Sequence, residues 1–139
     1  MLQDLDTMLK KAKTIAVIGC SKNEYRTSHH IASYLQEEGF TIIPIHPDYD
    51  EVLGEKAYDS ILDLPSDTEV DIVDIFRDSE HTAEMVEEII EWSERTGQKP
   101  VVWTQLGVSS DDARRLAEEA GLPYVEEKCL MVEHRNRVG

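Results

Sequence analysis

The chain of 139 residues has the length of one domain, and 40% of its residues are hydrophobic, which is enough for one packed core. It carries 29 acidic against 14 basic residues, a net charge of −15, which argues against nucleic acid or an anionic membrane as a partner, because both need a basic surface. The two cysteines, Cys20 and Cys129, lack CxxC spacing, so neither a disulfide framework nor a metal site is predicted.

Helical and strand patterns alternate along the first half of the chain. Apolar residues spaced by three or four positions predict helices, whereas unbroken apolar runs predict buried parallel strands. Pro44 lacks a backbone donor, so its strand is expected at an edge of the sheet or near its own end. The predicted elements are a lead-in helix within residues 1–11 packed against the sheet edge, a strand at 14–18, a helix at 28–38 and a strand at 41–45.

The second half resumes this alternation after an irregular segment. Glycine, proline and short apolar pairs predict a loop over residues 49–68 with one short helix near residues 60–64. Trp103 points inward in its strand and is expected in the core. The remaining elements are a strand at 70–76, a helix at 79–95 with Ser79 as its N-cap, a strand at 100–104, a helix at 110–120 and a strand at 123–126.

This order of elements predicts an α/β, Rossmann-like three-layer fold, with a five-stranded parallel sheet and helices on both faces, over one domain at residues 1–139. Doubly wound sheets bind ligands outside the carboxyl ends of their strands, near the switch in strand order. The candidate site therefore lies in the loops that follow the strands, at residues 19–28, 46–50, 77–79 and 105–109.

The first of these loops has the chemistry of a phosphate-binding site. Gly19 directly after the strand lets the backbone approach a phosphate, and the helix that follows offers free N–H groups and a positive dipole end. The dinucleotide pattern GxGxxG is absent, because Ser21 and Glu24 stand where its second and third glycines would be. Alternatively, Gly19 serves only the turn. The candidate ligands in this loop are Gly19, Cys20, Ser21, Lys22, Arg26, Thr27 and Ser28.

The loops after the other strands supply further candidates. An NAD-binding fold would place an acid after the second strand, but here His46 and Pro47 follow it and are expected at the adenosine end of a ligand. Arg77, after Phe76, is expected to bind a phosphate or carboxylate unless it pairs with an acid nearby. The candidates after the fourth strand are Gln105, Leu106 and Gly107, whose glycine permits close backbone approach.

Six segments, taken together and in order, resemble the family of small stand-alone CoA-binding proteins, which is similar to the CoA-binding domain of the succinyl-CoA synthetase α subunit. The segments are IAVIGCS at 15–21, IIPIHP at 42–47, LGEKAY at 53–58, VDIVDIFR at 70–77, VWTQLG at 102–107 and KCLMVEH at 128–134. The resemblance implies that the pyrophosphate is held by Gly19, Ser21, Arg26 and Ser28, the adenosine phosphate region by His46, Pro47 and Arg77, and the pantetheine arm by residues 105–107.

We therefore expect the protein to bind coenzyme A or an acyl-CoA, a small-molecule nucleotide ligand, as a carrier, sensor or regulatory module without catalytic machinery of its own. One alternative is an NAD(P)- or other nucleotide-dependent enzyme on the same fold. Another is a redox role, in which Cys20 or Cys129 forms a mixed disulfide with the CoA thiol, because a thiol near a helix N-terminus can be acidified. Each of these three functions is compatible with a homo-oligomer or with a catalytic partner chain.

The remaining expectations concern location. No apolar run approaches the length of a membrane span, and the first residues lack the basic and apolar regions of a signal peptide, so we expect a cytoplasmic protein. Acidic side chains gather over residues 84–94 and are interpreted as a solvated helix face. Adaptation to high salt is a second interpretation of this charge.

Overall fold

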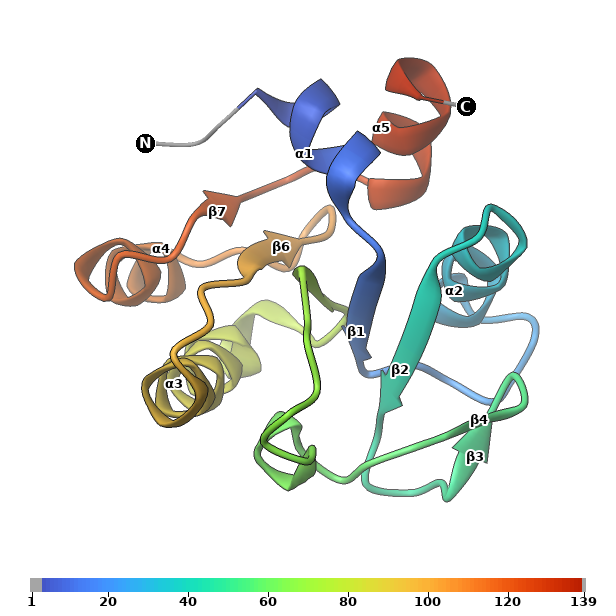
Figure 1. Cartoon of the computed structure of the whole chain (residues 1–139), viewed down its shortest axis with the longest axis horizontal. Helices are drawn as coiled ribbons and strands as arrows, with labels where there is room; N and C mark the ends of the chain where they lie inside the picture. Colours follow the sequence, from blue (N-terminus) through green and yellow to red (C-terminus); the bar gives the residue numbers. More distant parts are fainter. Residues whose placement is uncertain (1–3, 139) are drawn as a thin grey trace.

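A five-stranded parallel sheet forms the middle layer of the protein, and the computed structural model describes residues 4–138 around it (Figure 1). The strand order is β2-β1-β5-β6-β7, and each neighbouring pair is parallel. The strands are β1 (Thr14–Ile18), β2 (Thr41–Ile45), β5 (Ile72–Ile75), β6 (Val101–Thr104) and β7 (Tyr124–Val125). The predicted fold class is confirmed, and the strand that contains Pro44 is an edge strand, as expected.

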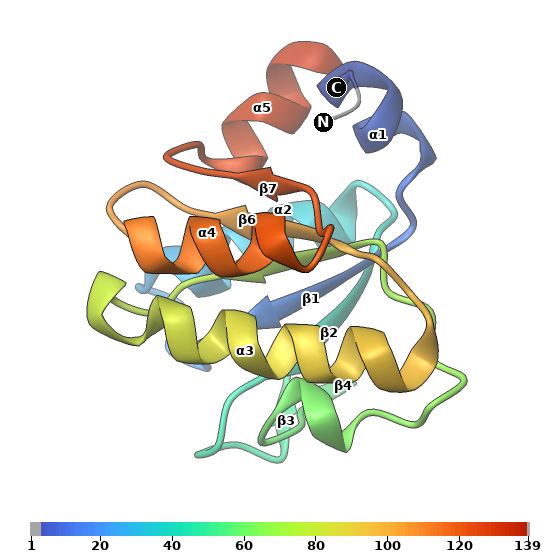
Figure 2. The ribbon, with the colours of Figure 1, turned by 90° about the vertical axis from the view of Figure 1, so that its left-hand side faces the viewer.

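Helices cover both faces of this sheet (Figures 1 and 2). The helices α1 (Leu5–Lys11), α2 (Thr27–Glu37) and α5 (Leu130–Arg137) pack on one face, and α3 (Ser79–Thr96) and α4 (Asp111–Glu119) pack on the other. Two buried apolar clusters result, because successive side chains of each strand point to opposite faces. Trp103 lies in the cluster beneath α2 and α5, and Trp92 of α3 lies in the other.

At the starts of α3 and α4 the structure differs by one residue from the sequence-based boundaries. Asp78 rather than Ser79 is the N-cap of α3, because the backbone is still extended at Asp78 and turns helical after it. Ser110 is the N-cap of α4, and its hydroxyl accepts a hydrogen bond from the backbone N–H of Ala113. None of the helices over residues 4–138 is both long and apolar enough to cross a membrane.

Two elements were not predicted. A small hairpin joins β3 (Glu51–Val52) to β4 (Glu55–Lys56), and both residues of its turn, Leu53 and Gly54, have positive φ. Such a turn is typical of a two-residue hairpin, but leucine is not the residue that signals it in a sequence. The C-terminal helix α5 was also missed, and an ion pair of 2.8 Å from Arg137 to Asp6 joins it to α1.

The segment after the hairpin lines the outer edge of β2. The backbone N–H of Tyr58 donates to the Pro44 carbonyl at 3.1 Å, and the N–H of His46 donates to the Tyr58 carbonyl at 2.8 Å. The short helix predicted near residues 60–64 is a 3-10 helix, η1 (Ile61–Asp63), with Ser60 as its N-cap. These contacts tie the loop after β2 to the edge of the sheet beside the candidate site.

Candidate functional site

A cavity of about 680 Å³ opens at the carboxyl ends of β1, β2 and β5. The chain leaves β1 to form β2 on one side of it and later returns to form β5 on the other, so this is the switch point of the sheet. The cavity is lined by Gly19, Ser21, Asn23, Tyr25, Arg26, Thr27, Ser28, His46, Asp48, Tyr49, Phe76 and Arg77. It thus draws on the loops after three adjacent strands.

At Gly19 the floor of this cavity is formed by backbone atoms alone, because glycine has no side chain. Its φ is +84°, and a β-carbon placed on it would lie 3.1 Å from the carbonyl oxygen of Phe76. The turn is fixed from both sides, because the N–H of Gly19 donates to the Ile45 carbonyl at 2.8 Å and the N–H of Phe76 donates to the Ile18 carbonyl at 2.9 Å. The fold therefore requires glycine at this position for both conformation and space.

The loop after Gly19 is organised by its own hydroxyl and amide side chains. The backbone N–H of Ser21 donates to the Ser28 hydroxyl, and the N–H of Asn23 donates to the Ser21 hydroxyl, both at 3.0 Å. The N–H of Tyr25 donates to the side-chain oxygen of Asn23 at 2.9 Å. Because both serine oxygens act as acceptors here, each hydroxyl hydrogen is left to donate to a ligand.

The N-terminus of α2 opens into the cavity without a side-chain cap. Arg26 is its N-cap residue, and its side chain makes no capping hydrogen bond. Within residues 4–138 no side chain accepts from the N–H groups of Thr27 or Ser28 either, so the first turn keeps free donors. Free donors and the positive end of the helix dipole together favour a phosphate or carboxylate at this point.

Two arginines supply the positive charge of the cavity. Arg26 and Arg77 both line it, and neither forms an ion pair with any acid among the described residues. The pairing of Arg77 with Asp78 that the sequence allowed is not formed, because Asp78 instead bonds to His81, and this bond is the main cause that lowers the pKa of the Asp78 carboxyl. Guanidinium groups without acidic partners are suited to bind a phosphate.

The wall opposite α2 comes from the loop after β2. The rings of His46 and Tyr49 pack with centroids 4.4 Å apart at 35°. The backbone N–H of Asp48 donates to His46 Nδ1 at 3.1 Å, so this nitrogen is an acceptor and the ring proton belongs on Nε2. Tyr25, in the loop after β1, adds a further aromatic ring to the lining and is 91% exposed.

The structure brings together most of the residues proposed from the sequence. The cavity contains Gly19, Ser21, Arg26, Thr27, Ser28, His46, Phe76 and Arg77, and Pro47 lines a smaller pocket beside it. Lys22 is exposed and does not line the cavity. Asn23, Tyr25, Asp48 and Tyr49 were not named from the sequence, although all four lie in or beside loops that were singled out as the ligand edge.

Cys20 also lies outside the cavity, in the core. Burial, and to a lesser extent the nearby Asp74 carboxyl, raises the pKa of its thiol to about 12. A position just before a helix N-terminus lowers the pKa of an exposed thiol, but for Cys20 the loss of solvation on burial has the larger effect on the pKa. The raised pKa favours the neutral thiol over the thiolate, which is the nucleophilic form.

The loop after β6 does not line the cavity. The side-chain oxygen of Gln105 accepts from the backbone N–H of Leu130 at 3.1 Å and so fixes the start of α5. The N–H of Gly107 donates to the Glu127 carboxylate at 3.0 Å, and Leu106 between them is 65% exposed. These three residues form a neighbouring stretch of the same sheet edge.

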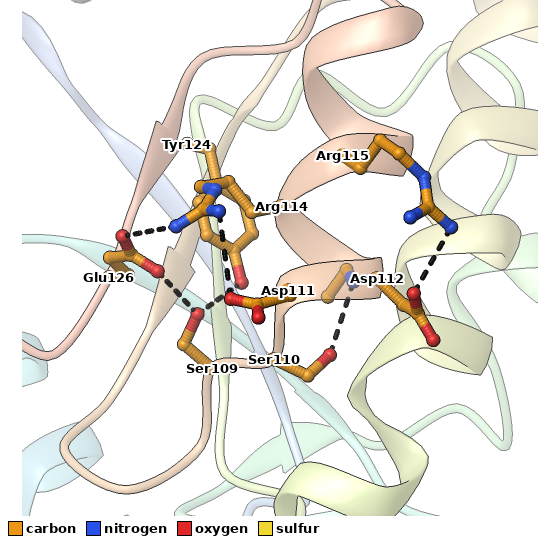
Figure 3. A network of polar contacts seen from close by, with 9 residues as sticks. Ser109, Ser110, Asp111, Asp112, Arg114, Arg115, Tyr124 and Glu126 are labelled. Atoms are coloured by element: carbon orange, nitrogen blue, oxygen red, sulfur yellow. Dashed lines mark hydrogen bonds and ion pairs between the residues drawn. The ribbon is translucent and has the colours of Figure 1, made fainter.

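A polar network fixes the end of that loop (Figure 3). The Ser109 hydroxyl lies 2.8 Å from both the Tyr124 hydroxyl and the Glu126 carboxylate. Arg114 of α4 donates to the other oxygen of Glu126 at 3.3 Å and approaches Asp111 at 3.6 Å. The loop after β6 is thus held against β7, and these contacts fix its conformation at Ser109.

Comparison with known proteins points to one family. A family model described as a CoA binding domain matches residues 13–135. The uncharacterized protein YneT of Bacillus subtilis is 35% identical over 131 residues, which cover 94% of this chain and 92% of that protein. A hypothetical protein from Pyrococcus horikoshii has a TM-score of 0.87 at 35% identity, over 100% of this chain and 99% of that one.

A part of a larger enzyme is also similar. Acetate–CoA ligase (ADP-forming) II of Archaeoglobus fulgidus is 31% identical over 101 residues, which are 71% of this chain but 14% of that protein. The fold and the cavity define a Rossmann-like α/β domain with a cavity lined by hydroxyl groups and two arginines at the switch in strand order. The chain belongs to the CoA binding domain family, which confirms the resemblance inferred from the sequence motifs.

Proposed function

We propose that this protein binds coenzyme A or an acyl-CoA, with the pyrophosphate over Gly19 and at the start of α2. One observation carries the proposal: a glycine turn with positive φ, in which a β-carbon would be crowded by the Phe76 carbonyl, lies beside an uncapped helix N-terminus and two arginines without acidic partners. Each of these features favours a phosphate, and together they surround one cavity. Membership of the family supports coenzyme A as the phosphate-bearing ligand.

The size and the walls of the cavity suit such a ligand. Its volume of about 680 Å³ lies within the usual range for small-molecule sites, which is roughly 300 to 1,000 Å³. The aromatic side chains of Tyr25 and Tyr49 line it together with the polar groups. A long ligand with a charged middle and less polar ends matches this distribution.

We further propose a role as a carrier, sensor or regulatory module. The hydroxyls of Ser21 and Ser28 accept backbone N–H groups, and among the described residues no hydrogen bond joins either hydroxyl to a histidine ring or a carboxylate. A nucleophile activated by a base needs such a contact. The neutral, buried thiol of Cys20 likewise supports binding over covalent chemistry.

The alternative ligand is a nicotinamide dinucleotide, and one residue favours it. Asp48 lines the cavity after β2, close to where a dinucleotide-binding fold places the acid that holds the ribose. The second and third glycines of the dinucleotide pattern are absent, however, with Ser21 and Glu24 in their places. NAD therefore belongs in any test of ligand preference.

The test is a calorimetric titration of the protein with coenzyme A, NAD and NADP, after removal of any ligand that co-purifies. We expect coenzyme A to bind at least about tenfold more tightly than either dinucleotide, a difference of about 1.4 kcal/mol. Equal or tighter binding of NAD would overturn the proposal. Lack of binding by all three would overturn it as well, provided that the protein still unfolds cooperatively.

A further inference from the structure

A second, smaller pocket opens on the other side of Gly19. It has a volume of about 210 Å³ and shares two lining residues, Gly19 and Arg77, with the main cavity. Whereas the main cavity lies toward α2, this side pocket lies toward α3, which contributes Met85 and Glu88 to it. A ligand that passes over the bare backbone of Gly19 can therefore occupy both spaces at once.

The side pocket differs from the main cavity in chemistry. Its walls are mainly apolar and are formed by Ile18, Ile45, Pro47 and Met85. The rest of the lining is the backbone of Gly19, the guanidinium of Arg77 and the carboxylates of Asp59 and Glu88. An apolar space with free carboxylates favours a flat, weakly polar group that carries hydrogen-bond donors.

The side chain of Glu88 is held in place by Ser60, the N-cap residue of η1. The Ser60 hydroxyl donates to Glu88 Oε1 at 2.6 Å, and the same hydroxyl accepts from the backbone N–H of Leu62 at 3.1 Å as the cap of η1. Figure 2 shows this short helix beneath α3. Among the described residues no donor contacts Glu88 Oε2, nor either oxygen of Asp59, so these oxygens can accept from a ligand.

We infer that the side pocket receives the purine base of the nucleotide and that Glu88, with Asp59, selects a base that bears an exocyclic amino group. Adenine fits this chemistry, because its rings are flat and its amino group donates to a carboxylate. A 6-oxo purine such as hypoxanthine presents an oxygen in place of the amino group and would face the carboxylates with an acceptor. The inference rests on the proposed function, and it adds two specificity residues that the sequence did not reveal.

The experiment compares ADP with IDP, two diphosphates that differ in the base, by calorimetry. We expect ADP to bind the wild-type protein about tenfold or more tightly than IDP, because a site built to accept a hydrogen bond rejects an analogue that lacks the donor. The Glu88→Ala and Asp59→Asn variants should reduce this ratio toward one. Glu91→Gln, on the same helix but outside the pocket, is the matched control and should leave the ratio unchanged.

The outcomes separate this inference from the proposed function. Equal binding of ADP and IDP by the wild type, with coenzyme A still bound, overturns the role of the side pocket and leaves the proposed function intact. An unchanged ratio in both Glu88→Ala and Asp59→Asn also overturns it. If Glu88→Ala weakens 4′-phosphopantetheine and not ADP, the pocket receives the pantetheine arm and the inference is wrong. Glu88→Gln, which keeps the size of the side chain, replaces Glu88→Ala if the latter fails to fold.

Discussion

Gly19 and Phe76 approach each other so closely that a β-carbon on the glycine would lie 3.1 Å from the carbonyl oxygen of Phe76. The contact joins the end of β1 to the end of β5. These are the two strands at which the strand order of the sheet reverses. The closeness of these two backbones gives the cavity a floor without side chains.

Gly19→Ala should destabilise the protein and weaken coenzyme A binding. A residue other than glycine at positive φ costs about 1 to 3 kcal/mol, and here the new methyl group would also lie 3.1 Å from the Phe76 carbonyl oxygen, which must shift to make room. Urea unfolding and calorimetry measure the two effects. Gly97→Ala is the control, since Gly97 has a φ of +79° but open space around it.

For the control variant we expect the conformational cost alone, with unchanged affinity for coenzyme A. If Gly19→Ala is no less stable than Gly97→Ala and binds as the wild type does, then the Gly19–Phe76 contact is not tight in solution. The assignment of the phosphate to this turn would then also be wrong.

Arg77→Ala should lose affinity for coenzyme A without losing stability. A hydrogen bond to a charged group contributes about 1.5 to 3 kcal/mol, which corresponds to a loss of roughly 10- to 150-fold in the dissociation constant. Stability should be unaffected because Arg77 forms no ion pair among residues 4–138. Arg115→Ala, which removes an exposed pair of 3.1 Å with Asp112, is the control and should change neither property by much.

The opposite pattern for Arg77→Ala, lower stability with intact affinity, would show that this side chain is structural. Calorimetry on both variants under the same buffer conditions, together with thermal unfolding, distinguishes the two patterns.

Asp74→Asn should stabilise the protein at neutral pH. Asp74 is fully buried in the middle of β5, neither of its carboxylate oxygens has a hydrogen-bond partner among the described residues, and burial raises the pKa of this carboxyl well above 3.8. A carboxyl with a raised folded-state pKa favours folding below about pH 4, where it is protonated in both states. That advantage is lost as the pH rises toward the folded-state pKa.

Asparagine cannot ionise, so the stability of Asp74→Asn relative to the wild type should increase with pH by about 1.4 kcal/mol per unit between pH 5 and the folded-state pKa of Asp74. All other acids are the same in the two proteins, so the difference isolates Asp74. Urea unfolding at pH 5, 6 and 7 provides the measurement. A difference that does not change with pH would mean that Asp74 is ionised in the folded protein.

Thiol labelling should separate the two cysteines. With a pKa of about 12, roughly one Cys20 thiol in ten thousand is ionised at pH 8, and its side chain is fully buried. Cys129 is only partly buried and should react first. A chromogenic disulfide reagent should therefore modify Cys20→Ser at the wild-type rate and leave folded Cys129→Ser unmodified. Rapid modification of Cys129→Ser would restore the redox hypothesis for Cys20.

The strands were the most predictable part of the fold. Strands β1 and β2 begin and end where the apolar runs place them, because a strand that is buried on at least one face and closed by glycine or proline leaves a clear pattern. The hairpin at Leu53 and Gly54 was missed because its turn uses a leucine at positive φ, which no local rule favours. Helix α5 was missed because its apolar residues have no regular helical spacing that would mark a buried face.

The site was predictable as a set of loops and less so as a set of side chains. Gly19 and Arg77 could be named because strand ends and parallel topology locate them. The pocket residue Glu88 could not, since it lies ten positions into a helix whose acids look alike in the sequence, and only packing against Ser60 distinguishes it. Cys20 shows the same limit, because its burial depends on α2 and α5 rather than on its neighbours in the chain.

The segment that runs along the outer edge of β2 has a consequence for self-association. An open edge strand offers a row of donors and acceptors on which another chain can add a strand, the first step of many aggregation processes. Here the Pro44 nitrogen has no hydrogen to donate, and the Pro44 carbonyl and the His46 N–H are already bonded to Tyr58. The sheet is thus blocked against edge-to-edge growth along this part of β2, so copies of this chain that meet in solution cannot extend the sheet from Pro44.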